Sequence, residues 1–252
     1  MEEGVGTGRG MLQQMLDALG EPALGSRLRV DGLQSWDARY PVTDLACASI
    51  GAAALMLSAW RNPSGGGQIH LDRALVSHWF GYSLKPVGWA LPKVRSALTG
   101  DYPAQDGWIR IHANAPHHER RALRLLGLSE NADRNAVADR VRHWHALDLE
   151  EALVGASACA AALRSPAAWR RHPQGVAVAA EPLVGWTADA AGSPGPAHVM
   201  DRRRPLSGVR VLDLTRVLAG PVATRFLAAY GATVLRLDPP SWSEPGLVPE
   251  VT

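Results

Sequence analysis

The sequence lacks most of the features that assign a protein to a class at first reading. It contains only two cysteines, Cys47 and Cys159, in alanine-rich contexts and without a CxxC pair. This excludes a disulfide framework and is typical of reduced, packed thiols in the cytoplasm. No HExxH motif or cysteine cluster is present, and the spacing of the neighbouring histidines puts no two of them on one helix face. We therefore expect no metal site.

Charge and hydrophobicity exclude further classes. The 26 basic and 24 acidic side chains leave a net charge of +2, and no basic stripe predicts a nucleic-acid partner. No uninterrupted run approaches the roughly 20 apolar residues of a membrane helix, so we expect no membrane partner. The acidic start, residues 1–4, has no apolar signal segment, and we expect a cytoplasmic protein.

The strongest pattern in the sequence lies at residues 205–240. Neither GxGxxG nor GxxxxGK[ST] occurs there, so the common nucleotide fingerprints are absent. Short apolar segments at 209–214 and 233–237 flank a helical pattern at 222–230, with Gly231 at its end. Two strands joined by one helix form a βαβ unit, so we predict parallel strands.

The amino-acid sequence of this stretch resembles that of one enzyme family. The segments GVRVLDLTRVLAGP (208–221) and YGATVLRLDPP (230–240) resemble the opening of the family III CoA-transferases. That family includes formyl-CoA and carnitine CoA-transferases and is related to acyl-CoA racemases. The resemblance implies that this stretch begins a Rossmann-like domain that binds coenzyme A, the only cofactor expected.

Segments before this stretch also resemble the family. In these transferases a catalytic aspartate opens a small-residue helix, followed by a glycine-rich turn and a strand. Here Asp44 opens DLACASIGAAALMLSAW (44–60), RNPSGGGQ (61–68) follows, and a strand is expected at 68–72. DGWIRIH (106–112) and WRRHPQ (169–174) resemble parts of the family's small domain, the latter before an expected final strand. The family's order is reversed here, because these segments precede the βαβ opening.

The resemblance implies a specific chemistry for Asp44. A carboxylate nucleophile attacks the acyl-CoA thioester, forms a mixed anhydride and releases CoA thiolate, which splits one difficult transfer into easier steps. A helix N-terminus would stabilise the ionised carboxylate. The alternative is that Asp44 only caps the helix, a common role for aspartate.

A second candidate site follows the first strand of the βαβ unit. The carboxyl ends of parallel strands are where ligands bind in open α/β sheets. By resemblance, this loop lines the CoA pocket, with its arginine near the thioester or the substrate carboxylate. The alternative is a tight turn that packs strand on helix. The residues concerned are Arg216, Val217, Leu218, Ala219 and Gly220.

The sequence thus predicts an α/β fold with a small-domain-like region at 35–187, a linker at 188–204 and an incomplete Rossmann-like domain at 205–252. The predicted function is transfer of CoA between an acyl-CoA and a carboxylic acid, by a homo-oligomer. Alternatives are an acyl-CoA racemase, which uses a His/Asp proton-transfer pair, and a non-catalytic CoA-binding remnant or partner subunit. From the reversed order we expect part of a tandem, rearranged or truncated transferase that is inactive on its own.

Overall fold

In the computed structural model the chain divides into two compact units, and the structure describes residues 2–62, 65, 67–81, 86–90, 96–187, 201 and 203–240. The first unit comprises Met1–Lys85 with Glu181–Pro240, and the second comprises Pro86–Ala180. The predicted region 35–187 contains parts of both units. Most of the predicted linker (188–200 and 202), the last residues (241–252) and Ser64 of the predicted glycine turn lie outside the described residues.

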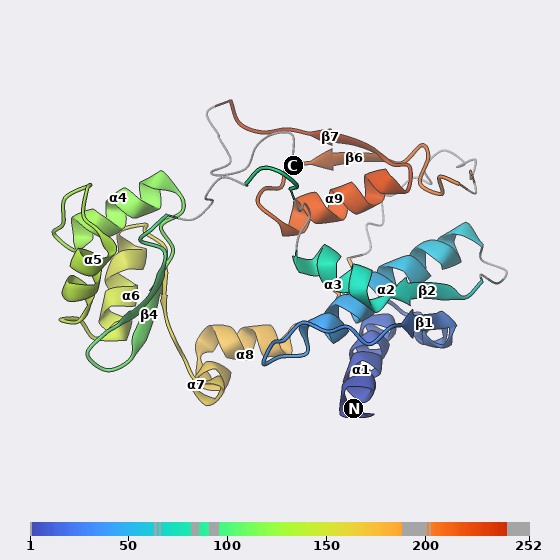
Figure 1. Cartoon of the computed structure of the whole chain (residues 1–252), viewed down its shortest axis with the longest axis horizontal. Coiled ribbons are helices and arrows are strands. Elements are labelled where there is room, and N and C mark those ends of the chain that lie inside the picture. Colours follow the sequence, from blue (N-terminus) through green and yellow to red (C-terminus); the bar gives the residue numbers. More distant parts are fainter. Residues whose placement is uncertain are drawn as a thin grey trace. The chain divides into compact units, whose positions relative to one another are not determined.

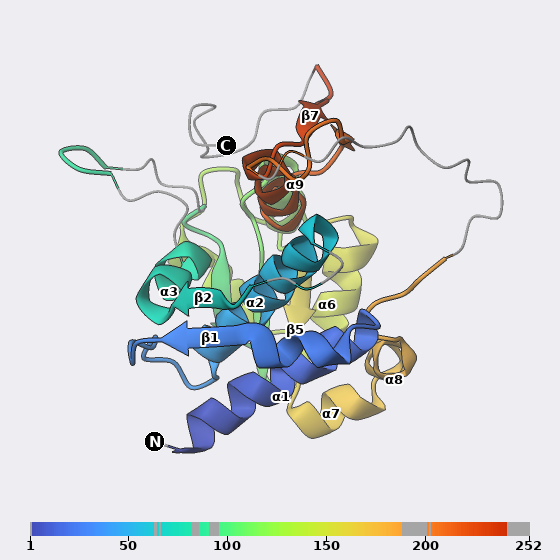
Figure 2. The ribbon, with the colours of Figure 1, turned by 90° about the vertical axis from the view of Figure 1, so that its right-hand side faces the viewer.

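The first unit begins with a helix and a parallel strand pair. After α1 (Glu2–Ala18) and the 3-10 turn η1 (Pro22–Arg27), β1 (Leu28–Asp31) pairs in parallel with β2 (Ile69–Asp72). Parallel strands need a crossover connection, and α2 (Val42–Arg61) supplies it. Figure 2 shows β1 and β2 side by side, with α3 (Arg73–Gly81) following directly on β2.

Small residues let α2 pack closely against its neighbours. A Cβ atom on Gly51 would lie 2.5 Å from a Leu28 methyl group, so any larger residue there would force the Leu28 side chain to shift at this contact between α2 and β1. By length and composition alone α2 could cross a membrane, but core helices of soluble proteins pass the same test. Here one side of α2 contributes to a core with α1 and η1. This core consists of Leu12, Leu16, Leu24, Ala48, Ala52 and Leu55.

The C-terminal part of the first unit confirms the predicted parallel strand–helix–strand order. β6 (Arg210–Asp213) pairs in parallel with β7 (Thr233–Arg236), and α9 (Ala219–Ala229) connects them. Gly231 follows the helix at φ +112°, a conformation that favours glycine. Its extension into a Rossmann-like domain stays a prediction. On the sheet face away from α9, four leucines are 51–64% exposed: Leu212, Leu214, Leu235 and Leu237.

The second unit is an antiparallel sheet with helices against one face (Figure 1). Its strands β3 (Gly100–Pro103), β4 (Trp108–Ile111) and β5 (Ala160–Ala162) lie in the order β3-β4-β5. The helices α4 (Pro116–Leu125), α5 (Arg134–Val141) and α6 (Ala146–Gly155) cover the sheet. Alternation along β4 buries Ile109 and Ile111, which join the helices in one core.

The structure corrects one expectation and adds one strand. The segment after WRRHPQ forms a helix, α8 (Pro173–Ala180), which follows α7 (Pro166–Arg171), so the expected final strand is wrong. Alternating Val176 and Val178 resemble a strand pattern, but proline at the start and alanine-rich sequence support a helix. The strand β1 has only four residues and was not predicted.

Candidate functional site

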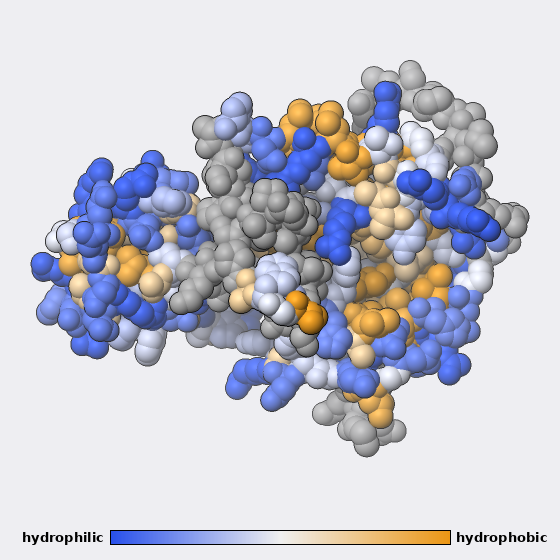
Figure 3. Space-filling model, turned by 45° about the horizontal axis from the view of Figure 1, so that its top comes forward, coloured by the Kyte–Doolittle hydropathy of each residue, from blue (hydrophilic) through white to orange (hydrophobic). Residues whose placement is uncertain are grey.

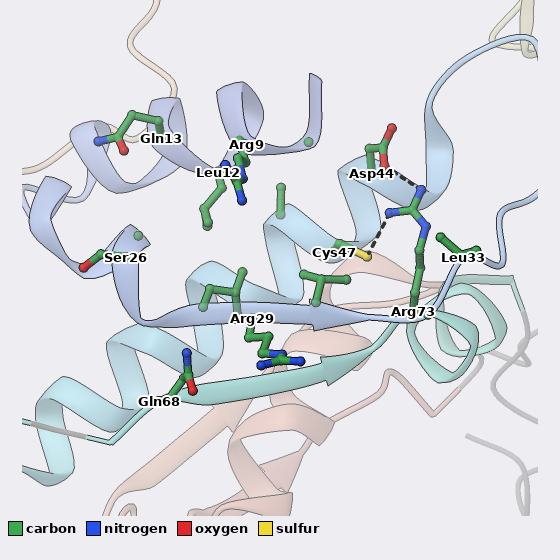
Figure 4. Close-up of a pocket in the computed structure, with 16 residues that line it drawn as sticks. Arg9, Leu12, Gln13, Ser26, Arg29, Leu33, Asp44, Cys47, Gln68 and Arg73 are labelled. Carbon is green, nitrogen blue, oxygen red and sulfur yellow. Dashed lines mark hydrogen bonds and ion pairs between the residues drawn. The ribbon is translucent and has the colours of Figure 1, made fainter. Parts of the chain in front are cut away.

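The first unit contains a pocket of about 740 Å³ between α1, β1, α2 and the start of α3. Figure 4 shows apolar side chains in the middle of this pocket and the Asp44, Cys47 and Arg73 side chains together at one end. Arg29 also borders the pocket, but its side chain lies on the other side of β1 in that view, where it pairs with Asp31. The carboxylate of Asp44, the guanidinium of Arg73 and the thiol of Cys47 thus meet at one end of the pocket, while Arg9 lies beside Leu12.

Asp44 lies inside the first turn of α2 and not at its cap. The helix begins at Val42 with Pro41 as its N-cap residue, so the alternative prediction of Asp44 as the cap is wrong. Asp44 is only 6% exposed. Gly8 in α1 makes room for this side chain, because a Cβ on Gly8 would lie 3.3 Å from the Asp44 Cβ. The position still places the carboxylate near the positive end of the helix dipole.

Arg73, the first residue of α3, is the charge partner of Asp44. Its Nη2 donates to Asp44 Oδ1 at 2.6 Å, and the two side chains are only 19% and 8% exposed. Its Nε donates to the Gln34 carbonyl oxygen at 2.8 Å, and Nη1 lies 3.8 Å from Cys47 Sγ. The guanidinium is thus held in place by contacts on several sides. A buried carboxylate with a matched guanidinium avoids the cost of an unpaired buried charge.

Cys47 lies one helical turn after Asp44 and contacts the same guanidinium. Burial raises the pKa of the Cys47 thiol, while the positive charge of Arg73 lowers that pKa and the negative charge of Asp44 raises it. The prediction of a packed thiol fits this burial, but it missed that Cys47 lines a pocket.

A hydrogen-bond network fixes the start of α2 against α3. Thr43 is 1% exposed, and its Oγ1 accepts from the Trp36 backbone N–H at 2.9 Å. It also lies 3.2 Å from Ser77 Oγ, while the Trp36 indole donates to the Ser77 carbonyl at 2.9 Å. Because Thr43 immediately precedes Asp44, these bonds restrict where the carboxylate can lie relative to α3.

The second candidate site has the geometry of a strained turn. Val217 has φ +70°, which is uncommon for a β-branched residue, and Leu218 is the N-cap residue of α9. Ala219 and Gly220 are the first two residues of that helix. A Cβ on Gly220 would lie 2.1 Å from Thr215 Oγ1, so glycine is needed for the turn itself. This observation supports the packing alternative for Gly220 and leaves CoA binding by this loop a prediction.

A buried aspartate holds the turn before α9. Asp213, 3% exposed, accepts from the Thr215 N–H at 2.8 Å and from the Thr215 and Thr224 hydroxyls at 2.5 and 2.6 Å. These hydrogen bonds, from Thr215 first, hold the pKa of Asp213 below its ordinary value. Both carboxylate oxygens are occupied, so Asp213 connects strand, turn and helix.

The structure places the two predicted sites on different elements. Asp44 lines the pocket, whereas none of residues 216–220 is among the described residues that line it. Sequence reasoning also missed Arg73. Its signal is its position directly after β2, at the carboxyl end of a parallel strand where α/β proteins place binding groups. Within the described residues no group of three or more His, Cys, Asp or Glu side chains is arranged to hold a metal ion.

Comparison with known proteins points to one class. Residues 206–245 match the sequence model of CoA-transferase family III. An acyl-CoA transferase of Gibberella moniliformis is 29% identical over 143 residues, which are 52% of this chain and 25% of that protein. The succinyl-CoA:glutarate CoA-transferase of Mus musculus is 48% identical over 59 residues, 21% of this chain and 14% of the relative. These matches confirm the resemblance to family III CoA-transferases, a family of enzymes.

The matches are partial on both sides. The chain spans about a quarter or less of the length of these two relatives. A solved structure of a hypothetical protein from Mycobacterium tuberculosis aligns with a TM-score of 0.43 and 13% identity, over 56% of this chain and 44% of that one. That similarity is too low to support an argument about fold.

Proposed function

We propose that the Asp44 pocket receives an acyl group from an acyl-CoA and passes CoA to a carboxylic acid. The observation that carries this proposal is a buried carboxylate on the wall of a 740 Å³ pocket, with a guanidinium 2.6 Å away. A pocket of this size accommodates a small acyl group together with part of its carrier. The family resemblance supplies the reaction class, and the pocket supplies a nucleophile of the right chemical type.

The first step of this reaction needs no proton transfer. An Asp44 oxygen attacks the thioester carbonyl carbon, the new C–O bond forms, and the C–S bond breaks with its electron pair leaving on the CoA sulfur. The product is a mixed anhydride on Asp44 and a free thiolate. In the return step the thiolate attacks the Asp44 carbonyl carbon of the anhydride, the bond from that carbon to the bridging oxygen breaks, and the donor leaves as a carboxylate. The acceptor carboxylate then attacks the resulting Asp44–CoA thioester, forms a second mixed anhydride and expels the CoA thiolate, which attacks the acceptor carbonyl carbon and releases the Asp44 carboxylate.

The residues of the pocket favour this transfer over racemisation. A racemase needs a His/Asp pair that removes and returns a proton. No histidine is among the described residues that line the pocket, which instead combine Asp44 with Arg73 and Cys47. Two relatives carry names of succinyl-CoA:glutarate CoA-transferases, and a CoA-linked acid exchange is consistent with that chemistry.

Trapping the anhydride tests the proposal without requiring turnover. The protein is incubated with an acyl-CoA and then with hydroxylamine, which converts an aspartyl anhydride to a hydroxamate that peptide mass spectrometry can locate. We expect the modification on Asp44 and its loss in Asp44→Asn. The matched control is Asp31→Asn, an exposed aspartate on the outer face of β1, which should keep the modification. Unchanged labelling in Asp44→Asn would rule out Asp44 as the acyl acceptor, whereas CoA binding by the wild type without any labelling would favour a CoA-binding remnant.

Assembly is a separate part of the proposal. We propose a homo-oligomer, because in the part of the chain that the structure describes β6 and β7 pair only with each other, and their outer edges can join strands of another copy. Exposed apolar side chains also lie on the face of the molecule drawn in Figure 3, where orange patches interrupt the polar surface. Light scattering across micromolar concentrations checks this, and a single monomeric peak throughout would contradict it.

A further inference from the structure

The position of Arg73 does not depend on Asp44 alone. The guanidinium uses one nitrogen for Asp44, and its other two nitrogens contact the Gln34 carbonyl and the Cys47 sulfur. A cation held in this way keeps its place when the charge of its carboxylate partner changes. Arg73 also lines the pocket, so it is accessible to a bound molecule.

The proposed reaction changes that charge. Before attack, the negative charge of Asp44 is balanced by Arg73 at 2.6 Å. After attack, the Asp44 anhydride is neutral and the negative charge has moved to the departing sulfur. The guanidinium stays positive and remains near the point where the C–S bond breaks. In a partly buried site such a fixed charge stabilises a developing anion more strongly than water does.

We propose that Arg73 is a further catalytic residue, the counter-ion that passes from the Asp44 carboxylate to the thiolate of the departing CoA. This inference rests on the proposed function of the pocket. It assigns Arg73 a role in the transition state as well as in the resting ion pair. A purely structural Arg73 would hold Asp44 in position and have no preference for one leaving group over another.

The dependence on the leaving group separates the two roles. The rate of adduct formation on Asp44 is measured in wild type, Arg73→Gln and Arg73→Lys, with an acyl-CoA and with an aryl thioester of the same acyl group. We expect Arg73→Gln to lose about 100-fold with acyl-CoA, the usual effect of removing one such donor. The loss should be clearly smaller with the aryl thioester, because an aryl thiolate needs less stabilisation. Arg73→Lys should recover part of the rate in both cases.

Cys47 provides a readout that needs no substrate. Asp44→Asn imitates the neutral acylated state, so the unbalanced Arg73 charge should lower the pKa of Cys47, whereas Arg73→Gln should raise it. The pH dependence of Cys47 alkylation measures this, with Cys159 in the second unit as the internal control thiol. The other charged residues that line the pocket, Arg9 on α1 and Arg29 on β1, are the same in all variants.

The outcomes distinguish this inference from the proposed function. Equal losses with both thioesters in Arg73→Gln, or a Cys47 pKa that does not fall in Asp44→Asn, would overturn the role of Arg73. An absence of any adduct on wild-type Asp44 with either donor would instead contradict the proposed function. Unequal losses of rate with the two thioesters in Arg73→Gln, together with a lower Cys47 pKa in Asp44→Asn and a higher one in Arg73→Gln, would establish that Arg73 serves as counter-ion first to Asp44 and then to the thiolate.

Discussion

The two strand–helix–strand segments of the first unit each contain a buried aspartate close to the start of their helix, and they neutralise it differently. In β1–α2–β2, Asp44 faces a guanidinium from the next helix, at 2.6 Å. In β6–α9–β7, Asp213 is surrounded by one N–H group and two threonine hydroxyls. The first arrangement balances one charge with another, and the second disperses a charge over neutral donors.

This difference is consistent with the reactive role proposed for Asp44 and with a structural role for Asp213. Asp213 has both oxygens occupied by donors from its own turn and helix, and it lies outside the described pocket lining. Asp44 contacts Arg73 through one oxygen and lines the pocket. A nucleophile needs an accessible oxygen lone pair and a partner that tolerates the loss of its charge. The following predictions test this comparison by disrupting each arrangement.

The largest effect is expected where one buried charge is left without its partner. Arg73→Gln should lower the free energy of unfolding by about 3 kcal/mol, because it leaves the buried Asp44 carboxylate without its charge partner. The double variant Asp44→Asn/Arg73→Gln should recover most of that loss. Urea unfolding followed by circular dichroism measures both. Arg29→Gln, which breaks an exposed ion pair, is the control and should unfold like wild type. Equal stability of the single and double variants would mean that the pair does not act as a unit.

The stability of the turn around Asp213 should be sensitive to the size of the side chain at position 220. Gly220→Ala places a methyl group where Thr215 Oγ1 lies 2.1 Å away, so the threonine must leave Asp213. We expect a loss of about 2 kcal/mol in the free energy of unfolding, within the usual range for overpacking. Gly10→Ala in α1, where a Cβ meets no atom within 4 Å, is the control and should not destabilise. A harmless Gly220→Ala would show that the turn is not tightly packed.

The same turn contains strain that a substitution can relieve. Val217 has φ +70°, and glycine adopts this conformation without steric cost. Val217→Gly should raise the free energy of unfolding by roughly 1 kcal/mol, the low end of such backbone strain. Thermal unfolding measures the change. A lower melting temperature would indicate that the valine side chain contributes more than its backbone conformation costs.

The smallest effect is expected for the contribution of Asp213 to the stability of the protein at acidic pH. Hydrogen bonds hold the pKa of folded Asp213 below the value of about 3.9 for an unfolded aspartate. Its stabilising contribution is therefore fully present above that value and is lost as pH falls through the folded pKa. We expect wild type to exceed Asp213→Asn in urea midpoint at pH 5–7, and the difference to shrink below about pH 4. A difference independent of pH would show that the charge of Asp213 is not the source of its effect.

Local sequence patterns predicted much of the fold. The strand at 209–214, the helix at 222–230 and the strand at 233–237 correspond to β6, α9 and β7 within a few residues, because apolar spacing and Gly231 mark them. The alanine-rich helix at 44–60 corresponds to α2 for the same reason. β1 was missed because its alternation of apolar and charged residues extends over only four positions, and its pairing with β2 is a contact across 41 residues. Such pairings depend on tertiary context and not on local propensity.

The candidate site shows the same limit. Asp44 could be named from a family resemblance that depends on order along the chain. Arg73 could not, because the identity of its partner depends on how α3 turns back along α2. The strain at Val217 was equally invisible, since nothing in its residue type favours a positive φ. Predictions from sequence therefore reached the carboxylate and missed the groups that control its charge.

The short separation of Asp44 and Arg73 along the sequence has a consequence for how the chain folds. Asp44 in α2 and Arg73 in α3 are 29 positions apart, and β2 is the one strand between the two helices. The entropic cost of closing a loop grows only slowly with its length. Contacts between residues that are close in sequence form early in folding. The ion pair can therefore assemble during synthesis, from a segment that ends at Gly81, before residues 201–240 have emerged. In a nascent chain the Asp44 carboxylate would then already be paired with the Arg73 guanidinium, so it would not be buried as an unpaired charge.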